Sequence, residues 1–179
     1  MRIFLFMVMI CLCFSCKKEI KTEAQVVPTE KSLDSLSKDH IRLDLLKLSS
    51  QGEKDLETFE DFQNLRNLSQ TLKTANPYYV KKYADSIQIL IQVFDENLSE
   101  DLNVNTINSR ISVLMTESGL LKQVTETQNP KPEKILEQNT RLLTAYNSLI
   151  VQLNELSLAI PENIEKELLR DLDEENKEE

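Results

Sequence analysis

The sequence predicts an all-α protein, folded as an antiparallel helical bundle of about five long helices plus a short C-terminal helix. From Glu30 onward the apolar residues recur at spacings of three and four, the pattern of helices that pack one stripe inward. Only two Gly and five Pro occur in 179 residues, fewer turn residues than a β-sandwich needs. Short connections between long helices favour antiparallel neighbours, so we expect one bundle domain over residues 30–172.

Two helices are expected at the start of this domain. The first covers about 30–50 and has two apolar faces, Leu33, Leu36, Leu43 and Leu46 on one and Ile41, Leu45 and Leu48 on the other. The stretch from Ser49 to Gly52 offers this helix a stop. The second helix then begins near Glu53, because the acidic residues from there to Asp61 suit the positive end of a helix dipole.

Three longer helices and a short one follow. Asn76 can cap the third helix and Pro77 suits its first position; its stripe is Val80, Tyr83, Ala84, Ile87, Leu90, Ile91, Phe94 and Leu98. The fourth repeats like a coiled-coil seam, at Ile107, Ile111, Leu114, Ser118 and Leu121. After the segment 129–132, the fifth carries Ile135, Leu142, Leu143, Tyr146, Leu149, Ile150, Leu153 and Leu156. Pro161 ends or kinks it, a short helix carries Ile164, Leu168 and Leu172, and residues 173–179 form an acidic tail that we expect to be disordered.

The first sixteen residues have the order of a secretory signal. Arg2 precedes an apolar run that ends at Phe14, and Ser15 and Cys16 follow. The run is shorter than the roughly 20 residues that a membrane-spanning helix needs. We therefore expect a signal peptide over residues 1–15. The alternatives are an uncleaved signal anchor, or ordinary secretion in which Cys16 has no role.

The junction at Ser15 and Cys16 resembles the lipobox of bacterial lipoproteins, in which a small residue precedes a cysteine that is lipidated and becomes N-terminal. Cys13 stands where that family usually has Leu. The charged continuation 17–19 is similar to that of Bacteroidota-type lipoproteins, in which it accompanies outer-membrane or surface placement. The resemblance implies a lipid on Cys16 that holds the protein to the outer membrane, facing the periplasm or the cell surface. Residues 16–29 then read as the lipidated cysteine and a flexible tether.

Composition argues against several function classes. The net charge of -9 repels phosphate backbones, so nucleic acid is not an expected partner. All three cysteines lie within the first sixteen residues, which leaves the bundle without a thiol for a disulfide, a nucleophile or a metal. His40, the single histidine, is expected at the core boundary, and Met115 is expected in the core. The acidic pair Glu60 and Asp61 lacks the glycine turn of a calcium loop, and no phosphate loop or serine elbow occurs. We expect no enzyme, no cofactor and no metal.

Apolar residues outside the main stripes are candidates for an interaction face. Ile89 and Val93 lie roughly opposite the stripe of the third helix, and Val113, Leu120 and Val124 lie away from the seam of the fourth, at about 100° per residue. Either neighbouring helices bury these residues, as compact domains usually do, or they form a docking surface.

Tyr78 and Lys82 are further candidates, because aromatic and cationic side chains at a helix start can bind a partner. The alternative is that they simply cover a loop. The expected function is that of a membrane-anchored, non-catalytic protein-binding or scaffold module with a protein partner in the cell envelope. The alternative function is a carrier of a small apolar ligand within the bundle.

Overall fold

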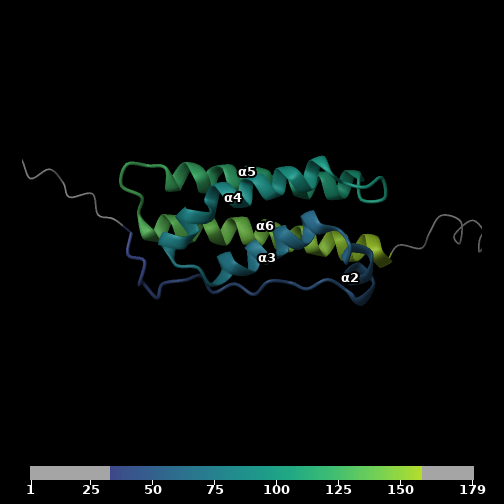
Figure 1. The fold of residues 1–179 in the computed structure, drawn as a ribbon, viewed down its shortest axis with the longest axis horizontal. Coiled ribbons are helices and arrows are strands. Elements are labelled where there is room, and N and C mark those ends of the chain that lie inside the picture. The colour runs from purple at the N-terminus through teal and green to yellow at the C-terminus, as the bar shows by residue number, and fades with distance from the viewer. Residues whose placement is uncertain (1–32, 159–179) are drawn as a thin grey trace, which may run out of the picture. The chain divides into compact units, whose positions relative to one another are not determined.

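The computed structural model describes residues 33–158, which form a helical bundle (Figure 1). Its helices are α2 (Ser50–Leu56), α3 (Glu60–Thr74), α4 (Pro77–Glu96), α5 (Asn105–Thr125) and α6 (Pro132–Leu158). No strand occurs among these residues, and the predicted all-α class is confirmed. No helix of the described range is both long and apolar enough to cross a membrane. The expected signal peptide, tether, short last helix and acidic tail lie outside the described residues.

The four longer helices run up and down, each antiparallel to the next (Figure 1). α4 packs against α3, α5 and α6, and α5 packs along α6. Asn76 caps α4 as predicted, since its side-chain oxygen accepts a hydrogen bond from the Tyr79 amide, and Pro77 is the first helical residue. The predicted stripes of α4, α5 and α6 form the core; its fully buried members include Val80, Ile91, Phe94, Ile107, Leu121, Ile135, Leu143 and Leu149.

The prediction of a helix over 30–50 is wrong for every described residue before Ser50. Residues 33–49, which we call the strap, form no helix and run along the bundle beside α6 to reach α2 (Figure 1). Ile41 is buried and Leu43 and Leu45 are half-buried, whereas Arg42 and Asp44 between them are exposed. This alternation with a period of two is that of an extended segment with one face on the core.

The prediction that one helix stops by Gly52 and the next begins near Glu53 is also wrong. α2 begins at Ser50, and the Ser49 side chain caps it by accepting a hydrogen bond from the Gly52 amide at 3.0 Å. Gly52 is buried against α6, where a Cβ would lie 3.2 Å from the Ser157 hydroxyl, so glycine permits this close approach. The chain breaks instead over residues 57–59, between α2 and α3.

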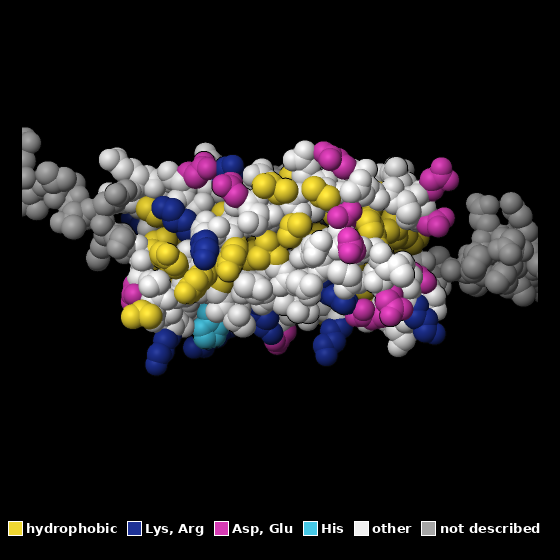
Figure 2. Space-filling model, in the orientation of Figure 1, with side chains coloured by type: hydrophobic (Ala, Val, Ile, Leu, Met, Phe, Trp, Pro, Cys, Tyr) yellow, Lys and Arg dark blue, Asp and Glu magenta, His cyan; other side chains and the backbone are white. Residues whose placement is uncertain are grey.

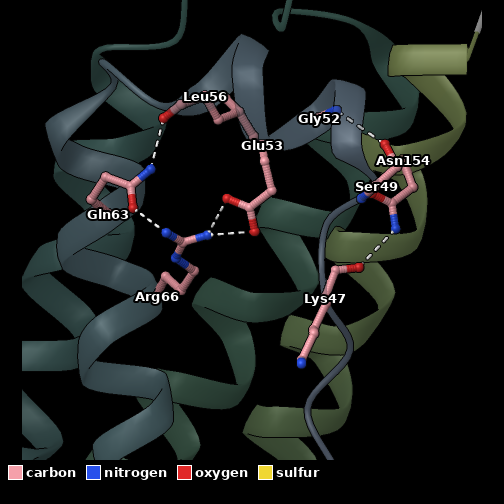
Figure 3. A network of polar contacts seen from close by, with 8 residues as sticks. All are labelled: Lys47, Ser49, Gly52, Glu53, Leu56, Gln63, Arg66 and Asn154. Carbon is pink, nitrogen blue, oxygen red and sulfur yellow. Dashed lines mark hydrogen bonds and ion pairs between the residues drawn. The ribbon is translucent and has the colours of Figure 1, made fainter.

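Two asparagines of α6 supply the hydrogen bonds that a neighbouring strand would give to the strap. Figure 3 shows the second of them, Asn154. In each, the side-chain oxygen accepts from a strap amide, and the side-chain nitrogen donates to the carbonyl two residues earlier. The bonds join Asn147 to Leu46 (2.8 Å) and Asp44 (2.9 Å), and Asn154 to Ser49 (2.7 Å) and Lys47 (3.1 Å). Seven helical residues rise about 10.5 Å and three extended residues about 10 Å, so both pairs fit in register.

Candidate interaction surfaces

Four of the predicted interaction residues lie on one side of α4. Tyr78, Lys82 and Ile89 are exposed and Val93 is half-buried. Their spacings of four, seven and four place them on one side of the helix, which we call the α4 face. Ile89 is 59% exposed, whereas Ile91, two residues further along the helix, is fully buried in the core.

The other three predicted residues form a separate surface on α5. Val113 is 47% exposed and Leu120 39% exposed, and Val124 is half-buried against the core. Lys122 of α5 points toward α4, where its ammonium lies 2.7 Å from the Asp85 carboxylate. Leu120 lies two residues earlier, about 200° around the helix, so it points away from α4. We call Val113, Leu120 and Val124 the α5 face.

The predicted residues therefore form two surfaces on different helices. The described helices leave Ile89, Val113 and Leu120 exposed, so the prediction that neighbouring helices bury them is wrong within this part of the chain. Val93 and Val124 are buried in part.

Aromatic and cationic side chains cluster at the start of α4. The rings of Tyr78 and Tyr79 meet edge to face with centroids 5.2 Å apart. The Lys82 ammonium lies 6.0 Å from the centroid of Tyr79 and 5.7 Å from that of Tyr83, within reach of cation–π attraction. Tyr83 is half-buried and packs on the core, so Lys82 joins the core edge to the exposed rings.

A groove of about 280 Å³ lies between the strap and helices α2, α3 and α6. Arg66 forms part of its wall and donates to both carboxylate oxygens of Glu53, at 2.7 and 2.9 Å, and to the Gln63 side chain at 2.6 Å (Figure 3). Gln63 in turn donates to the Leu56 carbonyl, so the network ties α3 to α2. The groove is thus lined by a formed ion pair as well as by apolar residues of the strap.

Tyr146 of α6 also lines this groove and is only 2% exposed. Burial raises the pKa of its hydroxyl above the usual range, and the nearby Glu53 carboxylate acts in the same direction, against the Arg66 guanidinium. The hydroxyl is therefore neutral at physiological pH and can donate a hydrogen bond. The sequence predicts Tyr146 in the core, but it does not predict that Arg66 pairs with Glu53. The available signal was that Arg66 directly follows Leu65, which is buried in α3.

The residues considered for metal or proton chemistry lie on different elements of the structure. His40 is exposed, contrary to its expected place at the core boundary, because the strap is not a helix; its ring Nδ1 lies 2.9 Å from the Lys38 carbonyl. Within residues 33–158 no group of three His, Cys, Asp or Glu could hold a metal ion. Glu60 and Asp61 lie in the first turn of α3 as expected, and Met115 packs against the core.

No protein-family model, curated protein or solved structure matches this chain. The N-terminal sequence and the surfaces of the bundle are therefore the features that bear on function.

Proposed function

We propose that this chain is a lipoprotein of the bacterial cell envelope, held to the outer membrane through a lipid on Cys16, whose bundle binds a protein partner without catalysing a reaction. The support for the anchor is the sequence around Ser15 and Cys16, which follows an apolar run too short to span a bilayer. Two or more acyl chains give stable attachment, so such an anchor suffices without a membrane-spanning helix.

The observation that supports protein binding is that some apolar side chains are exposed and do not belong to the core. The seam of α5 is complete, with Ile107, Leu114 and Leu121 all buried, yet Val113 and Leu120 on the same helix remain exposed. Grouped exposed apolar side chains are typical of protein interaction sites.

We assign docking to the α5 face in preference to the α4 face. Val113, Leu120 and Val124 follow one another at spacings of seven and four, which is how one helix presents a stripe to a partner helix. The α4 face instead includes the charged Lys82, and only two of its four residues, Ile89 and Val93, are aliphatic. The occupant that fits the α5 face is an amphipathic helix of another protein.

The carrier alternative has weaker support. The residues expected to line an internal apolar cavity, such as Ile91, Leu114 and Leu149, pack against one another in the core. The groove beneath the strap is lined by Glu53 and Arg66, and a charged wall does not suit a purely apolar ligand.

Affinity recovery from native membranes tests the proposal. The unmodified protein is compared with Leu120→Lys, which places a charge in the α5 face, and with Ser112→Lys, which adds the same charge at an exposed polar position of α5 that lies about 100° around the helix from Val113. We expect Leu120→Lys to lose a partner that Ser112→Lys retains, with equal melting temperatures for both. An identical set of partners for all three proteins would overturn the assignment. Ile89→Lys reports separately on the α4 face.

A further inference from the structure

The two ends of the bundle differ in what they expose. At one end lie the start of the strap, the α3–α4 junction and the start of α6; at the other lie α2, the α4–α5 loop and the end of α6 (Figure 1). We call them the strap-start end and the α2 end. The chain enters the described bundle at Leu33, at the strap-start end.

The charges are distributed unevenly between these ends. The α2 end carries mainly acidic side chains, among them Asp55, Glu57, Glu60, Asp61, Asp95, Glu96, Glu100 and Asp101. The strap-start end carries the lysines Lys38, Lys73, Lys81, Lys82, Lys131 and Lys134, interspersed with Asp34, Asp39, Glu126, Glu133 and Glu137. In the face shown in Figure 2, Asp and Glu prevail where α6 finishes, and Lys and Arg lie beside hydrophobic side chains near the opposite end. An anionic surface would therefore repel the α2 end far more strongly than the strap-start end.

Exposed apolar and aromatic side chains accompany these lysines. Leu36 is 85% exposed, and Tyr78 and Tyr79 are each 40% exposed. Lys81 and Lys82 beside them are exposed and form no ion pair with any residue of the described range. We call these five residues the tyrosine–lysine patch.

The Asn76 side chain brings the two parts of this patch together. Its nitrogen donates to the carbonyls of Ser35 and Ser37, at 3.0 and 2.8 Å, and so holds the strap on both sides of Leu36 against the start of α4. Its oxygen caps α4 at Tyr79. One side chain therefore holds the strap segment that carries Leu36 at the start of the helix that carries the two tyrosines.

We infer that the tyrosine–lysine patch lies on the surface of a membrane containing anionic phospholipids, with the α2 end pointing away. Tyrosine is favoured at the membrane–water interface, because its ring is apolar and its hydroxyl polar, and lysines are attracted by anionic headgroups. An exposed leucine between them can enter the acyl boundary. A protein partner could also contact such a patch, but the entry of the chain at this end and the opposite charge of the far end favour the membrane.

The inference rests on the proposed lipid anchor, which places the bundle near a membrane. It adds the orientation of the bundle on that membrane, which the anchor does not determine. The chain from Cys16 to Leu33 could span at most roughly 60 Å, which would permit every orientation of the bundle. The patch selects one of them. In that orientation the α5 face lies along the side of the bundle, open to a partner in the same compartment.

Vesicle co-sedimentation tests the inference with the chain from residue 17 onward, which lacks Cys16 and retains every residue of the compact unit from Ser32. We expect binding to vesicles of equal parts phosphatidylcholine and phosphatidylglycerol, and much weaker binding to phosphatidylcholine alone. Lys81→Glu/Lys82→Glu should weaken binding to the mixed vesicles by about tenfold or more. Leu36→Ser should weaken it on both kinds of vesicle.

The matched control is Lys47→Glu/Lys54→Glu, which makes the same change of charge at exposed positions toward the α2 end. Equal weakening by both double variants, or no binding of the unmodified chain to the mixed vesicles, would overturn the inference. A Lys81→Glu/Lys82→Glu protein that binds vesicles like the unmodified chain but loses a recovered protein partner would also overturn the inference. The patch would then be a protein interface. Because this chain has no Cys16, these outcomes are independent of whether Cys16 carries a lipid.

Discussion

The Asn154 side chain hydrogen-bonds the strap next to Ser49: its oxygen accepts from the Ser49 amide at 2.7 Å, while its nitrogen donates to the Lys47 carbonyl (Figure 3). Ser49 in turn caps α2, so one asparagine links the end of the strap, the start of α2 and the last turns of α6. The strap is part of the fold because side chains of α6 satisfy its backbone.

Asn154→Ala should therefore destabilise the protein by about 1–3 kcal/mol, because it leaves a strap amide and a carbonyl without partners. Asn64→Ala, at an exposed position of α3, should change the free energy of unfolding by less than about 0.5 kcal/mol. Urea denaturation measures both variants. Hydrogen exchange should show the Ser49 amide deprotected in Asn154→Ala alone; unchanged protection there would show that the strap does not need this asparagine.

Neighbouring residues of α5 should respond in opposite ways to the same charge. Leu121→Lys places a charge in the core and should cost several kcal/mol, enough to unfold a marginally stable domain. Leu120→Lys, at an exposed site, should leave the melting temperature within a few degrees of the unmodified protein. Thermal melting followed by circular dichroism distinguishes the two. A Leu120→Lys protein that unfolds like Leu121→Lys would mean that the α5 face is core.

The two glycines of the chain should also differ. A Cβ at Gly119 would meet only the tip of Gln88, at 3.9 Å, so Gly119→Ala should stabilise α5 by up to about 1 kcal/mol. A Cβ at Gly52 would lie 3.2 Å from the Ser157 hydroxyl and 3.3 Å from that of Ser49, so Gly52→Ala should gain less or destabilise. Equal stabilisation by both, measured by urea denaturation, would argue against the close approach of α2 to α6.

Tyr146 should make the protein sensitive to alkali. Burial raises the pKa of its hydroxyl in the folded state, whereas a tyrosine in the unfolded chain ionises near pH 10. The stabilising contribution is thus present below about pH 10 and is lost as the pH rises further, because the unfolded state loses its proton first. Tyr146→Phe should lose less stability than the unmodified protein between about pH 9 and 11. Parallel stability curves over this range would contradict a buried, neutral hydroxyl.

The sequence predicted the all-α class and three of the helices because their stripes are long and bounded by strong signals. Asn76 and Pro77 begin α4 as expected, and the seam from Ile107 to Leu121 is buried throughout. The strap was misread because its leucines fit a helical spacing as well as an extended one. The alternation of Ile41 and Leu43 with Arg42 and Asp44 was the signal for an extended segment.

The surfaces were harder to predict than the helices. Periodicity alone located Ile89 and Leu120 outside the main stripes, but which helix packs on which side decides whether such residues are covered. The tyrosine–lysine patch depends on Asn76 holding the strap around Leu36 against the start of α4, through hydrogen bonds to residues 41 and 39 positions earlier in the sequence. The charge difference between the two ends arises only from the up-and-down arrangement, which brings together segments that are distant in the sequence.

Intact-mass analysis of the protein recovered from bacterial membranes tests whether Cys16 carries the lipid that we propose holds this chain to the envelope. We expect a chain that begins at Cys16, with residues 1–15 removed and the mass of the attached acyl chains added. A Cys16→Ser variant should lose the added mass and leave the membrane fraction on extraction with salt or alkali. A membrane-bound protein that still begins at Met1, or a Cys16→Ser variant that remains lipid-modified, would contradict this proposal.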